Sequence, residues 1–496
     1  MTSSENFEIK ETTIADIHAA FQAGTLTARK LVKMYCDRID AFDQKGPAIN
    51  SLISINPRVM DEADRLDGVF KSSGLVGPLH GIPLIMKDQC DIAEMPTTMG
   101  SVLFKDHMPG RDSFVARKLK KAGAIFIAKA TLGEMGAGDT HGSLFGSTRN
   151  VYDLDCTAGG SSGGTAAAVS ANFGAAGIGQ EGLASIRRPS IWNGIAGMRP
   201  TAGLVSRDGV YAGWPSINGS LGPMARDITD LARLLDCMVG YDPNDPITAR
   251  GVGQAPDSFT AALDMDALSG ARIGILREIM GFHTDSRSED FNKVTVVFEK
   301  SINELRESGA EIIDNIMIPE LADLLTKRAS DPEEVGESFR AYMAGSANAP
   351  FATREEVMAS PLFAKTSRGV RRRWGSKSSK EAHHNYLKAR ELLMTRFLVV
   401  MADHNLDAVV HKAVEHTPTL IKDGINPPYV DQKGAPSINT FLVFVPSVVV
   451  PSGFTSNDRP TGITFLGRPY DDSNMLNLAY AYEQATHHRR APASTP

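Results

Sequence analysis

The chain has 496 residues, a net charge of −6 at neutral pH, 42% hydrophobic residues and 22% charged residues. This length is sufficient for a large core, and the mild acidity argues against nucleic-acid binding, for which a basic patch is expected. No apolar run approaches 18 residues and no apolar signal core follows the first methionine, so we expect neither a membrane-spanning helix nor a secretory leader. The four cysteines lack a Cys-x-x-Cys pair, which is typical of reduced thiols in a cytoplasmic protein.

Helical and strand patterns alternate along the chain. Thr13 is the expected cap of a helix that ends near Gln22, and Thr27 is the expected cap of a second helix with one apolar face. Further helices are expected after Asp112 and over residues 163–172, 288–308 and 380–403, and strands over residues 124–128, 271–276, 312–313 and 441–451. This alternation predicts an α/β fold with a largely buried sheet.

Lys87 ends a short apolar run, residues 82–86, which reads as a buried strand. Burial disfavours the ammonium form and lowers the pKa of a lysine from its ordinary value of about 10.4. A neutral lysine can serve as the base that a serine nucleophile requires. A lysine at the end of an apolar run is more often a surface charge. A catalytic role for Lys87 is therefore indicated only in combination with other segments of the chain.

Residues 157–164 read Thr-Ala-Gly-Gly-Ser-Ser-Gly-Gly and contain Ser161. Such a run alone is more often a flexible linker, and no Gly-Lys-Ser/Thr follows it to make a phosphate loop. Its glycines lack side-chain bulk, so that the backbone can approach a ligand closely. A further serine, Ser185, follows in Gln-Glu-Gly-Leu-Ala-Ser-Ile-Arg-Arg-Pro, residues 180–189.

Taken together and in this order, the three segments resemble the amidase signature family, serine hydrolases with a Ser-Ser-Lys triad and no histidine. The motifs at residues 87–101, 150–164 and 198–206 carry the resemblance, which extends over about 10–240 and 435–484. We therefore expect one amidase domain over 1–496 with a variable, substrate-covering region at about 250–434. Residues 487–496 are expected to be a flexible tail.

The resemblance implies a fold and three roles. The fold is a single mixed, mostly buried β-sheet wrapped by helices. Ser185 is the nucleophile, Ser161 follows a cis peptide bond and relays protons, and Lys87 is the base. No cofactor is implied, and the histidines between residues 383 and 416 lack the spacing of a zinc site, so we expect no metal.

The nucleophile loop departs from the family pattern Gly-Thr/Ser-Asp-x-Gly-Gly-Ser. Here the N–H groups of Gly182, Leu183, Ala184 and Ser185 are expected to form the oxyanion hole, although Leu183 and Ala184 replace the usual glycines. Glu181 replaces the aspartate, so hydrogen bonds beneath the loop are expected to be rearranged, and Leu183 is expected to fill space near the scissile bond.

Other residues are candidates for the substrate site or for charge interactions. The expected pocket residues are Met135, Gly136 and the rest of their turn, Phe282, Trp374 and Phe441. Arg188 has no counterpart in the family and is predicted to be a surface or salt-bridge charge. The basic segment 371–374 is either an anion or partner site or, more commonly for such a run, a solvated helix face.

The residues favour hydrolysis of a linear carbon–nitrogen amide bond through a serine acyl-enzyme, with a small apolar or aromatic amide as substrate and with esters and carbamates as further substrates. The alternative is the glutaminase subunit of a tRNA-dependent amidotransferase, against which stand the altered nucleophile loop and the divergent region 250–434. A third hypothesis, a non-catalytic protein with this fold, conflicts with the presence of all three triad residues. The expected partner is a small-molecule amide, without nucleic acid or membrane, and the resemblance is compatible with a homodimer.

Overall fold

The computed structural model describes residues 7–281, 283–376, 378–430 and 434–496. Its largest element is an eleven-stranded sheet. The strands of this sheet are β1 (Leu52–Ile55), β2 (Pro83–Lys87), β3 (Ile125–Ala130), β8 (Ala176–Glu181), β9 (Ala196–Arg199), β10 (Ser220–Ala225), β11 (Arg272–Leu276), β12 (Glu311–Ile316), β13 (Ala408–Lys412), β14 (Ser447–Phe454) and β15 (Pro460–Leu466). Two short ribbons pair β4 (His141–Gly142) with β5 (Gly146–Ser147) and β6 (Arg149–Asn150) with β7 (Asp153–Thr157).

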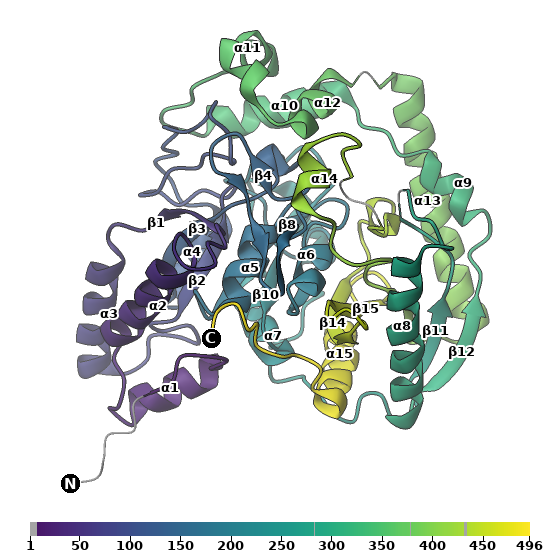
Figure 1. Cartoon of the computed structure of the whole chain (residues 1–496), viewed down its shortest axis with the longest axis horizontal. Helices are drawn as coiled ribbons and strands as arrows, with labels where there is room; N and C mark the ends of the chain where they lie inside the picture. The colour runs from purple at the N-terminus through teal and green to yellow at the C-terminus, as the bar shows by residue number, and fades with distance from the viewer. Residues whose placement is uncertain (1–6, 282, 377, 431–433) are drawn as a thin grey trace.

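Helices surround this sheet (Figure 1). The α-helices are α1 (Ile14–Gln22), α2 (Ala28–Phe42), α3 (Val59–Ser73), α4 (Phe114–Lys121), α5 (Gly163–Ser170), α6 (Arg187–Trp192), α7 (Ile228–Met238), α8 (Glu289–Glu307), α9 (Leu321–Thr326), α10 (Pro332–Ala344), α11 (Arg354–Ala359), α12 (Arg368–Gly375), α13 (Lys380–Asp403), α14 (Ile421–Ile425) and α15 (Asp472–Thr486). Short 3-10 helices are η1 (Glu134–Gly136), η2 (Pro246–Gly251), η3 (Pro361–Lys365) and η4 (Ile438–Thr440). No α-helix in the described part of the chain is long and apolar enough to cross a bilayer.

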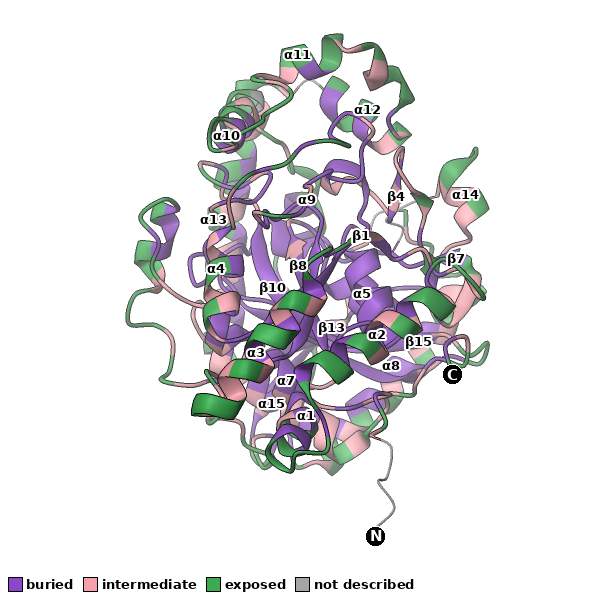
Figure 2. Cartoon of the chain, turned by 90° about the vertical axis from the view of Figure 1, so that its left-hand side faces the viewer, coloured by how far each residue is buried: buried purple, intermediate pink, exposed green. Residues whose placement is uncertain are grey.

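The large sheet is mixed and its strand order is β1-β3-β2-β8-β10-β9-β14-β15-β13-β11-β12. β2 runs parallel to both β3 and β8, whereas β10 is antiparallel to β8 and to β9. Every residue of β2, β3 and β10 is buried, and Figure 2 shows the buried strands behind the exposed outer faces of α2 and α3. These features confirm the predicted α/β fold with a mixed, mostly buried sheet wrapped by helices.

Most helix starts lie where the sequence predicted them. Thr13 accepts a hydrogen bond from the Asp16 N–H in a capping box before α1, and the Thr27 side chain caps α2 by accepting from the Lys30 N–H. The helix expected after Asp112 begins one residue later, because Ser113 provides the cap. Local capping chemistry was therefore sufficient to place these helices.

The strand expected over residues 441–451 is only partly correct. β14 begins at Ser447, and η4 precedes it at Ile438–Thr440. Residues 441–446 form turns and irregular backbone, and Pro446, directly before β14, has no N–H to donate to a neighbouring strand. The buried guanidinium of Arg199 donates to the carbonyl oxygens of Asn439 and Leu442 at 3.0 and 3.2 Å, so this apolar segment is held as a loop.

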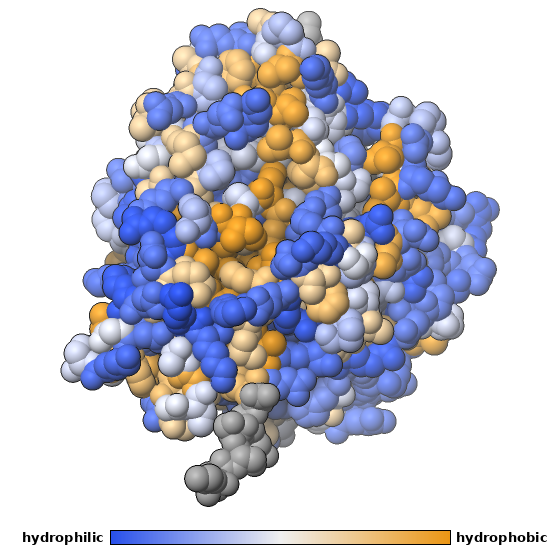
Figure 3. Space-filling model, turned by 60° about the vertical axis from the view of Figure 1, so that its left-hand side comes forward, coloured by the Kyte–Doolittle hydropathy of each residue, from blue (hydrophilic) through white to orange (hydrophobic). Residues whose placement is uncertain are grey.

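The helices α10, α11 and α12 form a lobe at the top of the molecule in Figures 1 and 2. An apolar and aromatic cluster joins this lobe to the body, and its members include Met135, Tyr211, Phe339, Tyr342 and Trp374. On the face shown in Figure 3, a stripe of apolar surface runs down from the top of the molecule. The lobe belongs to the region that we expected to be variable and to cover the substrate site.

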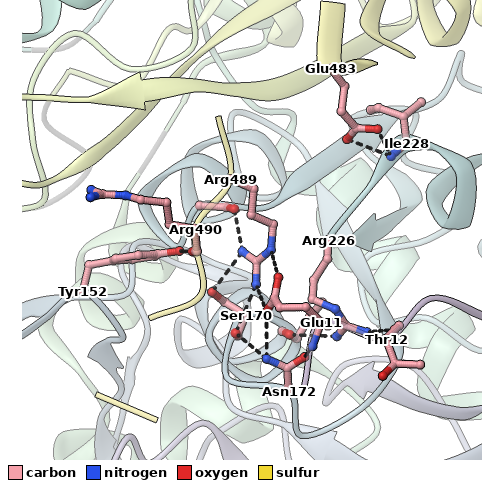
Figure 4. Close-up of polar contacts among 12 residues, drawn as sticks. Glu11, Thr12, Tyr152, Ser170, Asn172, Arg226, Ile228, Glu483, Arg489 and Arg490 are labelled. Atoms are coloured by element: carbon pink, nitrogen blue, oxygen red, sulfur yellow. Dashed lines mark hydrogen bonds and ion pairs between the residues drawn. The ribbon is translucent and has the colours of Figure 1, made fainter. Parts of the chain in front are cut away.

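The end of the chain, which the sequence predicted to be a flexible tail, forms hydrogen bonds with the body of the molecule in the structure. Arg489 donates to the Glu11 carboxylate at 2.7 Å and to the carbonyl oxygens of Gly194 and Ser170 at 2.7 and 3.3 Å (Figure 4). Further along, the Ser494 hydroxyl donates to the Val151 carbonyl at 2.6 Å. The partners of these residues lie far away in the chain, where composition gives no indication of them.

Candidate active site

Lys87 is the last residue of β2, and its side chain is fully buried. Its Nζ donates to Ser161 Oγ at 2.7 Å and to the carbonyl oxygen of Gln180 at 3.1 Å. Burial lowers the pKa of Lys87 to about 7, and the Arg373 charge adds to this lowering, whereas Cys90 and Glu181 oppose it. A substantial fraction of Lys87 is therefore neutral near pH 7.

Ser161 lies in the glycine-rich segment that enters α5, directly after a cis Gly160–Ser161 peptide bond. Close packing explains the glycines around it. A Cβ atom at Gly160 would lie 2.4 Å from the Gly138 carbonyl oxygen, and one at Gly163 would lie 2.3 Å from Thr140 Oγ1. Only glycine allows the backbone to approach the neighbouring loop so closely.

Ser185 lies in the loop between β8 and α6, and its side chain is buried. The Ser162 N–H donates to the Ser185 carbonyl oxygen at 3.0 Å, which fixes this loop against the glycine-rich segment. The structure therefore places the three predicted residues in adjoining segments: Lys87 is hydrogen-bonded to Ser161, and the Ser185 backbone is hydrogen-bonded to Ser162, the next residue.

The loop before Ser185 is held from below by Glu181. Its carboxylate accepts hydrogen bonds from the N–H groups of Ile186 and Arg187 at 2.8 and 3.0 Å and from Arg187 Nε at 2.7 Å. The same guanidinium donates to the Leu183 carbonyl at 2.7 Å. Within the described residues, the N–H groups of Leu183, Ala184 and Ser185 donate to no protein acceptor.

Arg188 was expected to be a surface or salt-bridge charge, and the structure places it in a buried salt bridge. Its Nη2 lies 2.5 Å from the Asp139 carboxylate and donates to the Gly160 carbonyl at 3.1 Å. The guanidinium also lies over the Trp192 ring, 5.0 Å from its centroid. Arg188 therefore joins the glycine-rich segment to the loop that contains Met135.

That loop forms η1, in which Met135 adopts a left-handed backbone with φ 51°. The buried Glu134 carboxylate accepts hydrogen bonds from the Ser143 hydroxyl and from the Ser367 N–H, both at 2.5 Å. Arg373 of α12 donates to the Gly136 carbonyl at 3.3 Å. The loop is thus attached to the start and the end of α12.

The predicted pocket residues divide into two groups. Met135, Gly136 and Trp374 come together where the upper lobe meets the body. Phe441 belongs to a different apolar cluster, in which its ring lies 5.2 Å from that of Tyr386, and Phe282 lies outside the described residues.

The sequence analysis did not predict the hydrogen bonds of Glu134 or the salt bridge between Arg188 and Asp139. No local motif marks these residues, because each joins segments that are distant in the chain. In the part of the chain that the structure describes, no three His, Cys, Asp or Glu side chains gather in a way that could hold a metal ion.

Comparison with known proteins places the chain in a family. The family model described as Amidase matches residues 30–476, so the chain belongs to the amidase family and is an amidase-signature hydrolase. It is 32% identical to a glutamyl-tRNA(Gln) amidotransferase subunit of Symbiobacterium thermophilum, over 97% of this chain and 98% of that protein. It is 28% identical to an Arabidopsis thaliana protein named "Probable amidase", over 99% of this chain and 93% of that one.

Among solved structures, it resembles the peptide amidase of Stenotrophomonas maltophilia, with 30% identity and a TM-score of 0.84 over 98% of this chain and 99% of that chain. This likeness covers the central sheet and the surrounding helices together. The chain is therefore an enzyme of the family that hydrolyses amides, in agreement with the resemblance of its sequence motifs.

Proposed function

We propose that the protein is an amidase that cleaves a linear carbon–nitrogen bond through an acyl-enzyme on Ser185. The observation that carries this proposal is the 2.7 Å hydrogen bond between the buried Lys87 and Ser161, at a lysine whose pKa is lowered to about 7 by burial. A base with a pKa near the working pH is well suited to proton transfer at a serine hydroxyl.

In the proposed reaction, the Ser185 hydroxyl passes its proton to Ser161 while the Ser161 proton moves to neutral Lys87. Ser185 Oγ attacks the amide carbonyl, and the N–H groups of Leu183, Ala184 and Ser185, together with that of Gly182, stabilise the oxyanion. The protonated Lys87 returns a proton through Ser161 to the departing amine. Water then attacks the ester to release the acid and restore Ser185.

The proposed substrate is a small amide with an apolar or aromatic group, and esters and carbamates offer the same carbonyl. Leu183 supports this choice, because it forms a small buried apolar cluster with Ala184 and Ala435 beside the nucleophile. Met135 contributes to the larger aromatic cluster beneath the upper lobe. We further propose that the protein is cytoplasmic, since all four cysteines are free thiols, and that it acts without a partner subunit.

The second candidate function is that of a glutaminase subunit in an amidotransferase. It is favoured by the 32% identity to the Symbiobacterium thermophilum protein, which extends over almost the whole of both chains. In this function the protein would release ammonia from glutamine only within a complex.

A substrate panel with the purified chain tests the proposal: anilides, primary amides, carbamates and glutamine, without added protein or ATP. We expect amide hydrolysis by the wild type and a loss of several orders of magnitude in kcat for Ser185→Ala. Ser162→Ala is the matched control, because Ser162 is a buried serine of the same segment that lies outside the proposed relay. Acyl-enzyme trapped on Ser162 would contradict the assignment of Ser185, and glutaminase activity that requires partner proteins and tRNA would favour the second candidate.

A further inference from the structure

A cavity lies beside the loop that contains Met135 and Gly136. It is bounded by the loop itself, by the start of α12 and by α14 with the residues around it. Its lining residues include Ala137, Asp139, His141, Arg368, Ile421 and Tyr429. The loop, α12 and α14 are distant in sequence, so the cavity depends on the fold of the whole upper half of the molecule.

The cavity is separated from the proposed catalytic residues by a single stretch of backbone. Gly138 and Asp139 line it, and these two residues also pack directly against Gly160, the neighbour of Ser161. Ala137, at its other side, follows Gly136 in the chain. A path from Ser185 to this cavity would run past Gly136, the residue before Ala137.

Two arginine side chains of α12 lie along this path. Arg368 lines the cavity, where its guanidinium stacks 4.1 Å from the centroid of the Tyr429 ring, and Arg373 donates to the Gly136 carbonyl. Among the described residues, neither arginine forms a salt bridge with a carboxylate. Arg371 of the same helix differs, because it donates to the carbonyl oxygens of Ala364 and Thr366, away from this path.

The carboxylates near the path already have other partners. Asp139 pairs with the buried Arg188, and Glu134 accepts hydrogen bonds from Ser143 and Ser367. Burial lowers the pKa of His141, which keeps this ring neutral near pH 7. The cavity and its approach therefore carry an excess of positive charge.

Part of the remaining wall is apolar. Leu420, Ile421 and Ile425 line the cavity together with the polar residues Ser147 and Thr157. A site that combines an apolar wall with one or two guanidinium groups is suited to a ligand with an apolar body and an anionic end, since arginine binds carboxylates through several N–H donors.

We propose that this cavity, with Arg368 and Arg373, is a subsite for a carboxylate at the end of the apolar or aromatic part of the amide substrate. This inference rests on the proposed amidase function and narrows its substrate class to anionic amides. It also gives a role to the basic segment, for which the sequence allowed either an anion site or a solvated helix face.

The test compares two series of anilides, one substituted on the aromatic ring of acetanilide and the other at the end of the acyl chain. Each series consists of matched pairs. One member of a pair carries a carboxylate after none, one or two methylene groups, and the other carries a methyl group in place of the carboxylate. The measured quantity is the ratio of kcat/KM for the anionic member to that for the neutral member, in the wild type, Arg368→Gln and Arg373→Gln. Arg340→Gln is the control, because Arg340 is an exposed arginine on α10 that does not line the cavity.

We expect the wild type to prefer at least one anionic compound, and Arg368→Gln to lower that ratio about tenfold, equivalent to about 1.4 kcal/mol. Arg373→Gln should lower it in the same direction, and Arg340→Gln should leave it unchanged. The same pairs, titrated by calorimetry against Ser185→Ala, measure the preference by binding alone, so a failure of catalysis does not hide the result. Equal kcat/KM and equal affinity for the charged and neutral members would overturn the proposal, as would a ratio that is unchanged in both Arg368→Gln and Arg373→Gln.

Discussion

At the scale of single residues, the charge of Lys87 determines the proposed chemistry. Its burial was predictable, because the apolar run before it indicated a buried strand that ends at this position. The partner of Arg188 was not predictable, because Asp139 lies on a different loop and only the folded chain brings the two side chains together. Sequence patterns thus located the lysine of the proposed proton relay but not the ion pair between Arg188 and Asp139.

The pH dependence of catalysis should report the neutral form of Lys87. We expect kcat/KM to rise with pH through an apparent pKa of about 7, because burial lowers the pKa of this lysine to that value and only the neutral amine can accept a proton. The measurement is a kcat/KM profile between pH 5 and 10.

Two variants of Lys87 test this assignment. Lys87→Ala should lose most activity together with the rising limb of the profile. Lys87→Arg should not restore activity, since a guanidinium does not lose its proton in this range. A Lys87→Ala enzyme with the wild-type profile would show that another group is the base.

At the scale of elements, the turn from β8 to α6 departs from the family sequence pattern and is held by several hydrogen bonds. The sequence indicated that Glu181 in place of aspartate would rearrange the hydrogen bonds beneath the loop. The structure supplies the arrangement, in which one carboxylate binds two backbone N–H groups and the Arg187 side chain. These bonds could not be predicted residue by residue, because they depend on the path of the backbone between the strand and the helix.

Removal of the Glu181 charge should destabilise the protein. In Glu181→Gln the side chain keeps its size, but the buried Arg187 loses its carboxylate partner, and such a loss costs about 3–5 kcal/mol. The free energy of unfolding from urea titrations measures this effect. Glu289→Gln serves as the control, because Glu289 pairs with Lys293 on the surface, where a salt bridge contributes less than about 1 kcal/mol. Equal free energies of unfolding for Glu181→Gln and Glu289→Gln would contradict a stabilising role of the buried Glu181–Arg187 pair.

Leu183 should affect the choice of substrate more than the chemistry. Its carbonyl is fixed by Arg187 and its side chain belongs to the apolar cluster with Ala184 and Ala435. Leu183→Ala enlarges the space beside the nucleophile, so we expect substrates with larger apolar acyl groups to gain in kcat/KM relative to acetamide.

Leu183→Gly separates this steric effect from loop rigidity, because glycine adds backbone freedom that alanine does not. Acetamide is the internal reference for both variants, since its acyl group is too small to fill the added space. If every substrate falls by the same factor in both variants, Leu183 acts through the rigidity of the loop and not through the shape of the pocket.

At the scale of the whole molecule, alternation of helix and strand was sufficient to predict the α/β class, and three motifs were sufficient to predict the family. The ends of the fold were less predictable. The strand expected from residue 441 begins only at Ser447, and the tail expected to be flexible is bonded to the body. In both places a buried or partly buried arginine, Arg199 or Arg489, binds backbone carbonyl groups that are remote in sequence.

The bonded tail should make a measurable contribution to stability. The Arg489 side chain is 13% exposed and binds Glu11 near the start of the chain, as well as two carbonyl groups. Hydrogen bonds that involve charged groups contribute about 1.5–3 kcal/mol, so we expect Arg489→Gln to lower the free energy of unfolding by about 2 kcal/mol. Arg490→Gln is the control, because its pair with Asp458 is exposed to solvent.

The effect of Arg489→Gln should also depend on pH. Burial alone would raise the pKa of Glu11, but the charge and hydrogen bonds of Arg489 lower it overall. A carboxyl group with a lower pKa in the folded state stabilises the fold above its unfolded pKa and loses this contribution as the pH falls through its folded pKa. The difference in the free energy of unfolding between wild type and Arg489→Gln should therefore have its largest value at pH 7 and decrease below about pH 4. A difference of equal size at pH 7 and pH 3 would mean that Arg489 acts through its carbonyl contacts and not through Glu11.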